Sequence, residues 1–190
     1  MAAWQYWSVI AAWIAWEIYW GLSARGVKRA ASKEPLASRL LVVAALILCF
    51  VFLLVPNWIA GFFARPLLPQ GGLFFYIGFA LLLAAMAFTV WARTTLGRNW
   101  SGRVTIKEDH ELVTTGPYGL VRHPIYTGAL LAIIGTTVAL GTIGGLVSIV
   151  LILAVFVRKI HLEEQVLGRH FGDKYAAYRN KTRALIPFVF

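Results

Sequence analysis

Two short segments of the chain carry side chains that could take part in chemistry together. The first, GPYGLVRHPIYTG at residues 116–128, ends inside the start of a long apolar run. It supplies a guanidinium, an imidazole and a phenol, from Arg122, His123 and Tyr126. The second, RKIHLEEQ at residues 158–165, follows that run and supplies an ammonium and two carboxylates, from Lys159, Glu163 and Glu164. Together these groups could hold a strongly polar ligand at the surface of an apolar phase.

The first segment has the features of a helix start. Pro124 suits the first helical position, because the N–H that proline lacks would have no partner there. His123 then occupies the N-terminal cap, and the free N–H groups of the first turn favour an anionic or strongly polar ligand group. Alternatively, Arg122 and His123 anchor the helix to lipid headgroups and Tyr126 belongs to an interfacial aromatic belt. These residues alone leave both interpretations open.

The apolar run between the two segments determines whether they can meet. It extends from residue 124 to 157, or about 51 Å as one helix, whereas the hydrocarbon core of a bilayer is about 30 Å thick. Because GTIGG lies within it at residues 141–145, we expect two helices joined by a tight glycine turn. The turn returns the chain to the same side, where Lys159 and Glu163 share one helical face. Such a pair is also common at an ordinary solvated helix end.

The composition is that of a membrane protein. Of the 190 residues, 59% are hydrophobic and 14% are charged, and the mean hydropathy of +0.72 is far above that of an ordinary soluble domain. Three more apolar runs, at residues 4–22, 40–64 and 73–92, are each long enough for a membrane-spanning helix, and we expect Pro56–Asn57 to kink or end the second. We predict an all-α integral membrane protein with about five transmembrane helices, the last two a tight hairpin, followed by a C-terminal helical segment.

The distribution of charge predicts the orientation. The formal net charge is +10, but the cations lie in short segments beside apolar runs, which indicates contact with membrane lipids rather than with nucleic acid. The loop after the first run holds Arg25, Lys28, Arg29, Lys33 and Arg39, whereas the loop after the second holds Arg65. We therefore expect the first loop, residues 93–123 and the C-terminal tail to face the cytosol, and the N-terminus to lie outside. The first run is expected to stay in the bilayer rather than to be cleaved as a signal peptide.

Other chemistries have little support in the sequence. The single cysteine, Cys49, lies in an apolar run, so there is neither a disulfide framework nor a thiolate metal site. The four histidines lack H-x-x-x-H spacing, and P-loop, nucleophile-elbow and dinucleotide-binding fingerprints are absent. We expect no metal. Glu17, an acid within the first apolar run, is a functional candidate that could also reach water or Arg25.

The two polar segments resemble a known family. HELVTTGPYGLVRHPIYTG, followed by EEQVLGRHFGDKYAAY and a closing LIPF, is similar to the isoprenylcysteine carboxyl methyltransferases and their relatives among membrane methyltransferases, which include phospholipid methyltransferases. The pattern of that group is R-H-P-x-Y and then a pair of glutamates, here Arg122 to Tyr126 and then Glu163 and Glu164. The resemblance covers roughly residues 94–190.

The resemblance implies S-adenosylmethionine-dependent methyl transfer, with the cofactor on the cytosolic side between the last two helices and the C-terminal segment. By position, the implied cofactor contacts are His110, Glu111, Leu112, Val113, Tyr118, His123, Pro124, Ile125, Tyr126 and Glu163. Lys159 occupies the position of the family's substrate-carboxylate arginine, which keeps the charge but loses the bidentate fork. The catalytic candidates are Lys159, Arg122 and Glu164, with Arg122 either a substrate contact or a headgroup anchor.

The predicted organisation is a single membrane domain, with three helices in residues 1–92 and a cofactor-binding catalytic half in residues 93–190. The leading hypothesis is carboxyl O-methylation of an isoprenylcysteine-type acceptor, either a prenylated small molecule or a prenylated protein. An alternative is N-methylation of a phospholipid headgroup, in which Glu164 or His161 would act as the base. From other classes, a sterol-reductase-like enzyme would use NADPH, and a scaffold or small transporter would have no catalytic site. The sequence does not specify the oligomeric state.

Overall fold

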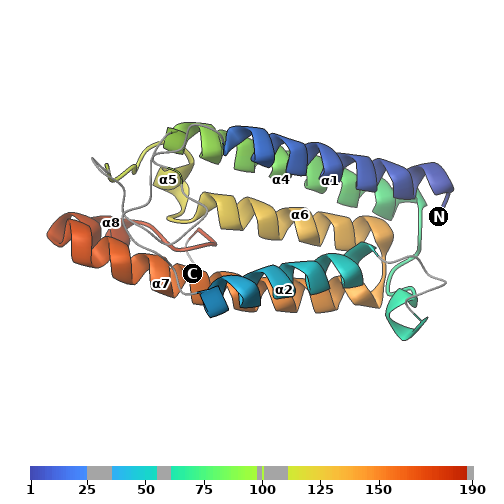
Figure 1. The fold of residues 1–190 in the computed structure, drawn as a ribbon. Helices are drawn as coiled ribbons and strands as arrows, with labels where there is room; N and C mark the ends of the chain where they lie inside the picture. Colours follow the sequence, from blue (N-terminus) through green and yellow to red (C-terminus); the bar gives the residue numbers. More distant parts are fainter. Residues whose placement is uncertain (25–35, 55–60, 98–99, 101–110, 188–190) are drawn as a thin grey trace.

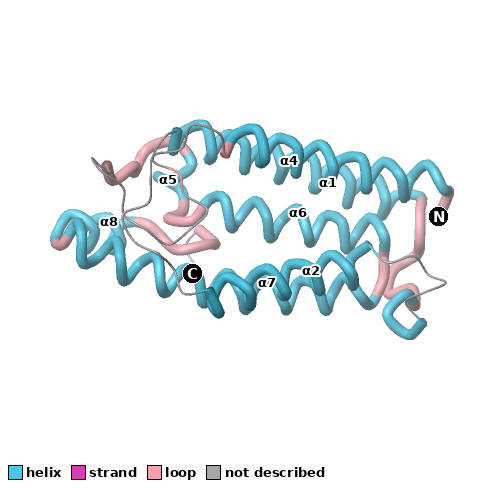
Figure 2. The backbone as a smooth tube through the Cα atoms, in the orientation of Figure 1, coloured by secondary structure: helices cyan, strands magenta, loops and turns pink. Residues whose placement is uncertain are grey.

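The computed structural model describes residues 1–24, 36–54, 61–97, 100 and 111–187. Within these residues the secondary structure is helical, and the chain pairs otherwise only in isolated bridges. The helices are α1 (Ala3–Ser23), α2 (Leu36–Leu54), the 3-10 turn η1 (Gly61–Ala64), α4 (Gly72–Leu96), α5 (Pro117–Leu120), α6 (Pro124–Leu140), α7 (Ile143–Phe171) and α8 (Asp173–Lys181). Five of them are long and run side by side along one axis (Figure 1), and irregular segments gather at the two ends of the bundle (Figure 2).

α4 and α6 form the closest helix pair, because glycines remove the side chains that would separate them. A Cβ on Gly78 would lie 2.5 Å from the carbonyl oxygen of Gly135, and a Cβ on Gly135 would lie 2.6 Å from the backbone nitrogen of Leu82. Small residues at such crossings let two helix backbones approach closely, as in membrane helix pairs. This contact places the start of α6 beside the end of α4.

The predicted hairpin between the last two long helices is present. Gly141 follows α6 in the left-handed conformation, with φ of 65°, and its N–H donates to Thr137 O at 2.8 Å. The turn is shorter than expected: Gly144 and Gly145 lie in the first turn of α7, where Gly145 packs against the side chain of Thr137. The physical reason is that a single left-handed glycine already ends a helix.

α1 attaches to this pair through tryptophan side chains. Trp13 Nε1 donates to Thr136 Oγ1 on α6 at 3.0 Å, and Trp16 Nε1 donates to Thr89 Oγ1 on α4 at 2.9 Å. Trp13 is buried and also meets Phe50 of α2 edge to face, with ring centroids 4.9 Å apart. The tryptophans therefore fill the core between α1, α2, α4 and α6.

The second expected span, residues 40–64, is not one helix throughout. The described part of α2 ends at Leu54 and residues 61–64 form the separate turn η1, while the expected kink or end at Pro56–Asn57 lies outside the described residues. Gly61 has a φ of 50°, which an α-helix does not accommodate. Among the described residues, α4 and α7 are long and apolar enough to cross a membrane, while α6 and the Leu40–Leu54 part of α2 are shorter apolar helices. The count of five crossings therefore stays a prediction.

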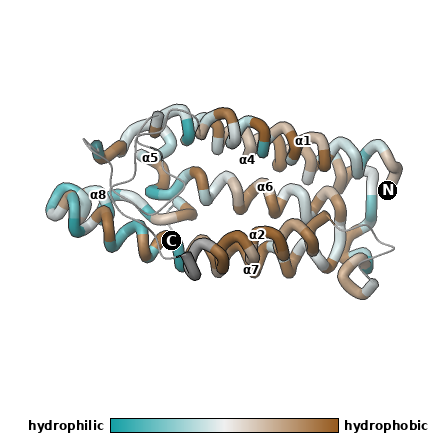
Figure 3. Tube along the Cα trace, in the orientation of Figure 1, coloured by the Kyte–Doolittle hydropathy of each residue, from teal (hydrophilic) through white to brown (hydrophobic). Residues whose placement is uncertain are grey.

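The polar chemistry gathers at one end of the bundle. Figure 3 shows hydrophobic residues along α2 and the neighbouring part of α7, and hydrophilic residues in the distal part of α7 and in α8. The end of α4, α5, the start of α6 and α8 all lie at this end (Figure 1). The end of α1 is tied to them by Arg93, a buried cation that donates to Ser23 O at 2.5 Å and to Gly97 O at 2.7 Å. Because the start of α6 and the distal part of α7 both lie at this end of the bundle, the two polar segments meet.

Candidate active site

The start of α6 has the predicted geometry. Pro124 is the first helical residue and is fully buried, and His123 is the cap residue, although its side chain makes no capping hydrogen bond. The imidazole instead turns toward α7, where its Nδ1 lies 3.5 Å from Glu163 Oε2 and its Nε2 lies 3.3 Å from Glu164 Oε1. The helix start and the glutamate pair, far apart in sequence, thus form one cluster.

Tyr126 and Lys159 complete this cluster on its apolar side. The Tyr126 hydroxyl donates to Glu163 Oε1 at 2.5 Å, and its ring stacks on His123 and on Phe156, with centroids 5.7 and 4.7 Å away. Lys159 Nζ lies 5.5 Å from the centre of the Tyr126 ring, at the range of a cation–π contact. A partly buried acid, an aromatic ring and a cation therefore lie next to one another.

Arg122 belongs to the same cluster but faces the C-terminal segment. Its Nε and Nη2 each lie 2.8 Å from Glu164 Oε1, and its Nη1 donates to the carbonyls of Arg179 and Thr182. The backbone runs alongside: Arg122 N donates to Arg183 O at 2.8 Å and His123 N to Ala184 O at 3.0 Å. The side chains of Arg122 and Glu164 are only 9% and 11% exposed.

These groups lie on the polar extension of α7 and at the cap of α6, beyond the apolar runs, and they shift one another's pKa. Burial opposes ionisation of Glu164, but the hydrogen bonds from His123 and Arg122 outweigh it and lower its pKa to about 2. Burial likewise opposes ionisation of Glu163, yet hydrogen bonds from His123 and the charges of His123 and Lys159 lower its pKa. Burial opposes protonation of His123, but its two glutamate partners raise its pKa above the ordinary value. The cluster therefore favours an imidazolium between two carboxylates.

This cluster predicts a pH-dependent stability. Because the pKa of His123 is raised on folding, its stabilisation is complete below the ordinary imidazole value of about 6.5 and is lost as pH rises through the folded pKa. We expect the melting temperature of the wild type to fall toward that of His123→Gln as pH rises from 6 to 9. Thermal unfolding of both proteins across this range measures the difference. A melting-temperature difference that stays constant would contradict the imidazolium assignment.

α5 and α8 add aromatic residues around the cluster. Tyr118, an implied cofactor contact, is buried in α5, and its carbonyl accepts a 2.6 Å hydrogen bond from the hydroxyl of Tyr178 on α8. Tyr175, one turn before Tyr178, is 4% exposed. Sequence reasoning missed both α8 tyrosines, although their spacing of three in DKYAAY is a helical signal for one buried face.

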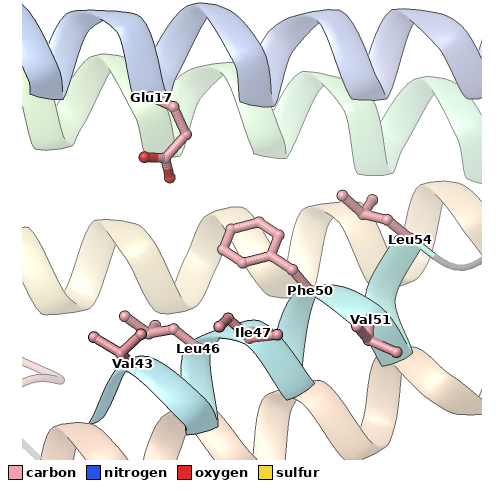
Figure 4. A pocket seen from close by; sticks show the side chains of 7 residues that line it. All are labelled: Glu17, Val43, Leu46, Ile47, Phe50, Val51 and Leu54. Atoms are coloured by element: carbon pink, nitrogen blue, oxygen red, sulfur yellow. The ribbon is translucent and has the colours of Figure 1, made fainter. Parts of the chain in front are cut away.

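The other predicted contacts lie before α5 and in the first turn of α6. Glu111 is exposed, and Leu112 and Val113 are partly buried in an irregular segment before α5. His110 lies outside the described residues. Ile125 is partly buried in the first turn of α6. A groove of about 590 Å³ lies elsewhere, between α1 and α2, lined by Glu17 and apolar side chains of α2 (Figure 4).

Comparison with known proteins agrees with this geometry. Residues 77–169, which include the cluster except for the C-terminal segment, match the isoprenylcysteine carboxyl methyltransferase (ICMT) family. The match covers just under half of the chain. The match to this family and the apolar α4 and α7 together support the prediction of a membrane protein.

Relatives of the isoprenylcysteine carboxyl methyltransferase family match over part of their length. A probable protein-S-isoprenylcysteine O-methyltransferase of Oryza sativa subsp. indica is 32% identical over 117 residues, which cover 60% of this chain and 61% of that protein. The protein-S-isoprenylcysteine O-methyltransferase of Schizosaccharomyces pombe is 38% identical over 101 residues, covering 52% of this chain and 43% of that protein. The aligned region thus spans about three fifths or less of these relatives.

A solved structure extends the likeness to the N-terminal helices. The eukaryotic intramembrane Ras methyltransferase ICMT superposes with a TM-score of 0.56 at 23% sequence identity, covering 84% of this chain and 55% of that one. At this identity the likeness shows a shared fold. The predicted all-helical architecture is therefore confirmed, and the matched part of that methyltransferase shares it.

Proposed function

We propose that this protein is an S-adenosylmethionine-dependent membrane methyltransferase that methylates the carboxylate of an isoprenylcysteine-type acceptor. The observation that carries the proposal is the meeting of the two family motifs: Tyr126 donates to Glu163 at 2.5 Å, beside the His123 imidazole. The activity named for the rice and fission yeast relatives supports the reaction and the acceptor class.

The residues at the cluster fit the chemistry of this cofactor. S-Adenosylmethionine, when bound, supplies an electrophilic methyl group on a sulfonium, together with an amino-acid end and an adenine. Glu163 is a partly buried anion suited to the ammonium, and the aromatic side chains of Tyr118 and Tyr126 would line the site beside it. His123, Pro124 and Ile125 would form the wall at the start of α6, and Glu111, Leu112 and Val113 are the remaining proposed contacts.

The acceptor carboxylate needs a cation but no base. Lys159 lies on the same face of α7 as Glu163 and over the Tyr126 ring, which places its ammonium next to the proposed cofactor site. A carboxylate is already nucleophilic, so the chain's contribution is to align the acceptor and to exclude water. A lipidic acceptor reaches such a site from the bilayer, with the polar end of the bundle facing the cytosol.

Lys159 gives a specific prediction about the acceptor. In Lys159→Met, the KM for a prenylcysteine acceptor should rise about tenfold or more while the affinity for S-adenosylhomocysteine changes little, because a charged hydrogen bond to the carboxylate is lost. Lys159→Arg should keep the acceptor affinity, since arginine presents the same charge with two donors. Steady-state kinetics and calorimetric titration measure the two effects. An unchanged acceptor KM in Lys159→Met would rule out this role.

The function is tested by following the label from methyl-labelled S-adenosylmethionine into a panel of prenylcysteine analogues and total membrane lipids. We expect base-labile label, that of a carboxyl methyl ester, in the prenylcysteine products. Base-stable label in phospholipid would instead indicate headgroup N-methylation. Binding of NADPH without binding of S-adenosylhomocysteine would indicate the reductase alternative, and binding of neither would indicate a scaffold or transporter.

A further inference from the structure

We infer that Arg122 and Glu164 are positioning residues that form a latch, holding the C-terminal segment 182–185 against the start of α6 and thereby orienting His123 for cofactor binding. The latch rests on the contacts of the described residues, and its link to the cofactor rests on the proposed function. It replaces two direct roles, a substrate contact for Arg122 and a base for Glu164, with an indirect one.

The side chain of Arg122 is fully committed within the protein. Each of its three guanidinium nitrogens has a partner: Nε and Nη2 bind Glu164 Oε1, and Nη1 binds the carbonyls of Arg179 and Thr182. At 9% exposure, the side chain would have to give up buried charge-assisted hydrogen bonds to reach an acceptor or a lipid headgroup. Joining α6, α7 and the C-terminal segment is therefore the role that its contacts support.

The segment held by this latch continues along the start of α6. Arg122 N donates to Arg183 O, His123 N donates to Ala184 O at 3.0 Å, and Thr127 Oγ1 donates to Leu185 O at 2.7 Å. Ala184 and Leu185 are 4% and 1% exposed and pack with Ile160 of α7. The segment thus closes one side of the cluster, and its backbone shields the N–H groups of Arg122 and His123 from water.

The latch also reaches the imidazole. The oxygen of Glu164 that binds Arg122 lies 3.3 Å from His123 Nε2, and the opposite ring nitrogen lies 3.5 Å from Glu163. Because Glu164 is fixed by Arg122, the imidazole is held with its other edge toward Glu163, the proposed cofactor ligand. Opening the latch releases one of the two carboxylates that orient the ring, so the stability of the latch should contribute to cofactor affinity.

Hydrogen exchange of the Arg122 and His123 amides measures the latch directly, because both amides donate to the C-terminal segment. In purified full-length Glu164→Gln we expect these amides to exchange about tenfold faster or more, and the Kd of S-adenosylhomocysteine to rise by a similar factor, as a charge-assisted bond is lost. Glu163→Gln is the matched control: it should weaken the same Kd without accelerating exchange.

Thr127→Val loosens the segment from a second point, without touching either glutamate. We expect exchange at the two amides to accelerate about threefold to tenfold, and the KM for S-adenosylmethionine to rise by a similar factor with kcat within about twofold of the wild type. This split separates a positioning effect on binding from a direct effect on the chemical step. It also tests the latch if Glu164→Gln fails to fold.

Wild-type exchange rates in both Glu164→Gln and Thr127→Val would overturn the latch, as would faster exchange with an unchanged Kd, which would uncouple the segment from the cofactor. These outcomes are distinct from failure of the proposed function. If the wild type bound no S-adenosylhomocysteine, the methyltransferase assignment and the cofactor link would fall together, whereas exchange at the two amides would still show whether Arg122 and Glu164 hold the segment.

Discussion

Replacing Glu163 with glutamine should weaken binding of S-adenosylhomocysteine about a hundredfold. Glu163 accepts from Tyr126 at 2.5 Å and lies 3.5 Å from the His123 imidazole, and its pKa is lowered despite burial, so the carboxylate is charged where the cofactor ammonium is proposed to lie. Glutamine keeps the shape but removes the charge, and losing one partner of a buried charge pair costs about 2–5 kcal/mol. Isothermal titration of the purified protein gives the two dissociation constants.

Asp173→Asn is the control for this prediction. Asp173 is an exposed carboxylate in the first turn of α8, and its removal raises the net charge by the same one unit at a position away from the cluster. Its Kd should stay within about twofold of the wild type. If Glu163→Gln and Asp173→Asn bound equally well while both remained folded, Glu163 would not be the ammonium ligand, and the cofactor would have to lie elsewhere.

Gly135→Ala should destabilise the helix bundle by about 3 kcal/mol or more. The added Cβ would lie 2.6 Å from Leu82 N and 2.8 Å from Gly78 O. Both atoms belong to the backbone of α4, which cannot move aside as a flexible side chain can, so the two helices must separate along their whole contact. Because Cys49 is the single cysteine and is fully buried, the reaction of a thiol-specific dye during heating measures the loss of stability.

Gly21→Ala is the matched control for Gly135→Ala. A Cβ on Gly21, which lies in α1, would meet nothing within 4 Å. The same substitution should leave the melting temperature unchanged or raise it slightly, because alanine lowers the entropy of the unfolded chain and favours a helix. Equal melting temperatures for Gly135→Ala and the wild type would show that α4 and α6 are not held by this close contact.

The positions of the long helices could be predicted because apolar runs of sufficient length have few alternative structures. The start of α6 followed from Pro124, and the hairpin followed from the length of its apolar run together with a glycine that adopts φ of 65°. Helix ends were less predictable. The apolar run at residues 40–64 includes residues 61–64, but these residues form the 3-10 turn η1 rather than an α-helix, because hydropathy reports burial from water rather than φ and ψ.

Sequence patterns also identified the residues of the cluster better than their roles. Arg122, His123 and Glu163 could be grouped because the hairpin returns α7 to the start of α6. The partners of Arg122 could not be foreseen, since the carbonyls of residues 179 and 182 carry no side-chain signal. Buried Arg93 was missed for a similar reason: it binds carbonyls at two helix ends, and carbonyls are present at every position of a sequence.

The continuity of α7 has a geometric consequence for the cluster. α7 runs unbroken from Ile143 to Phe171, so Glu163 stands about 30 Å from the turn at Gly141, measured along a stiff rod. The turn at Gly141, at the opposite end of the bundle, therefore sets the axial position of Glu163 relative to Tyr126. One residue inserted into that turn would have to be absorbed there, or it would displace Glu163 by about 1.5 Å along the axis and about 100° around it. A distant two-residue connection thus sets the alignment of the site.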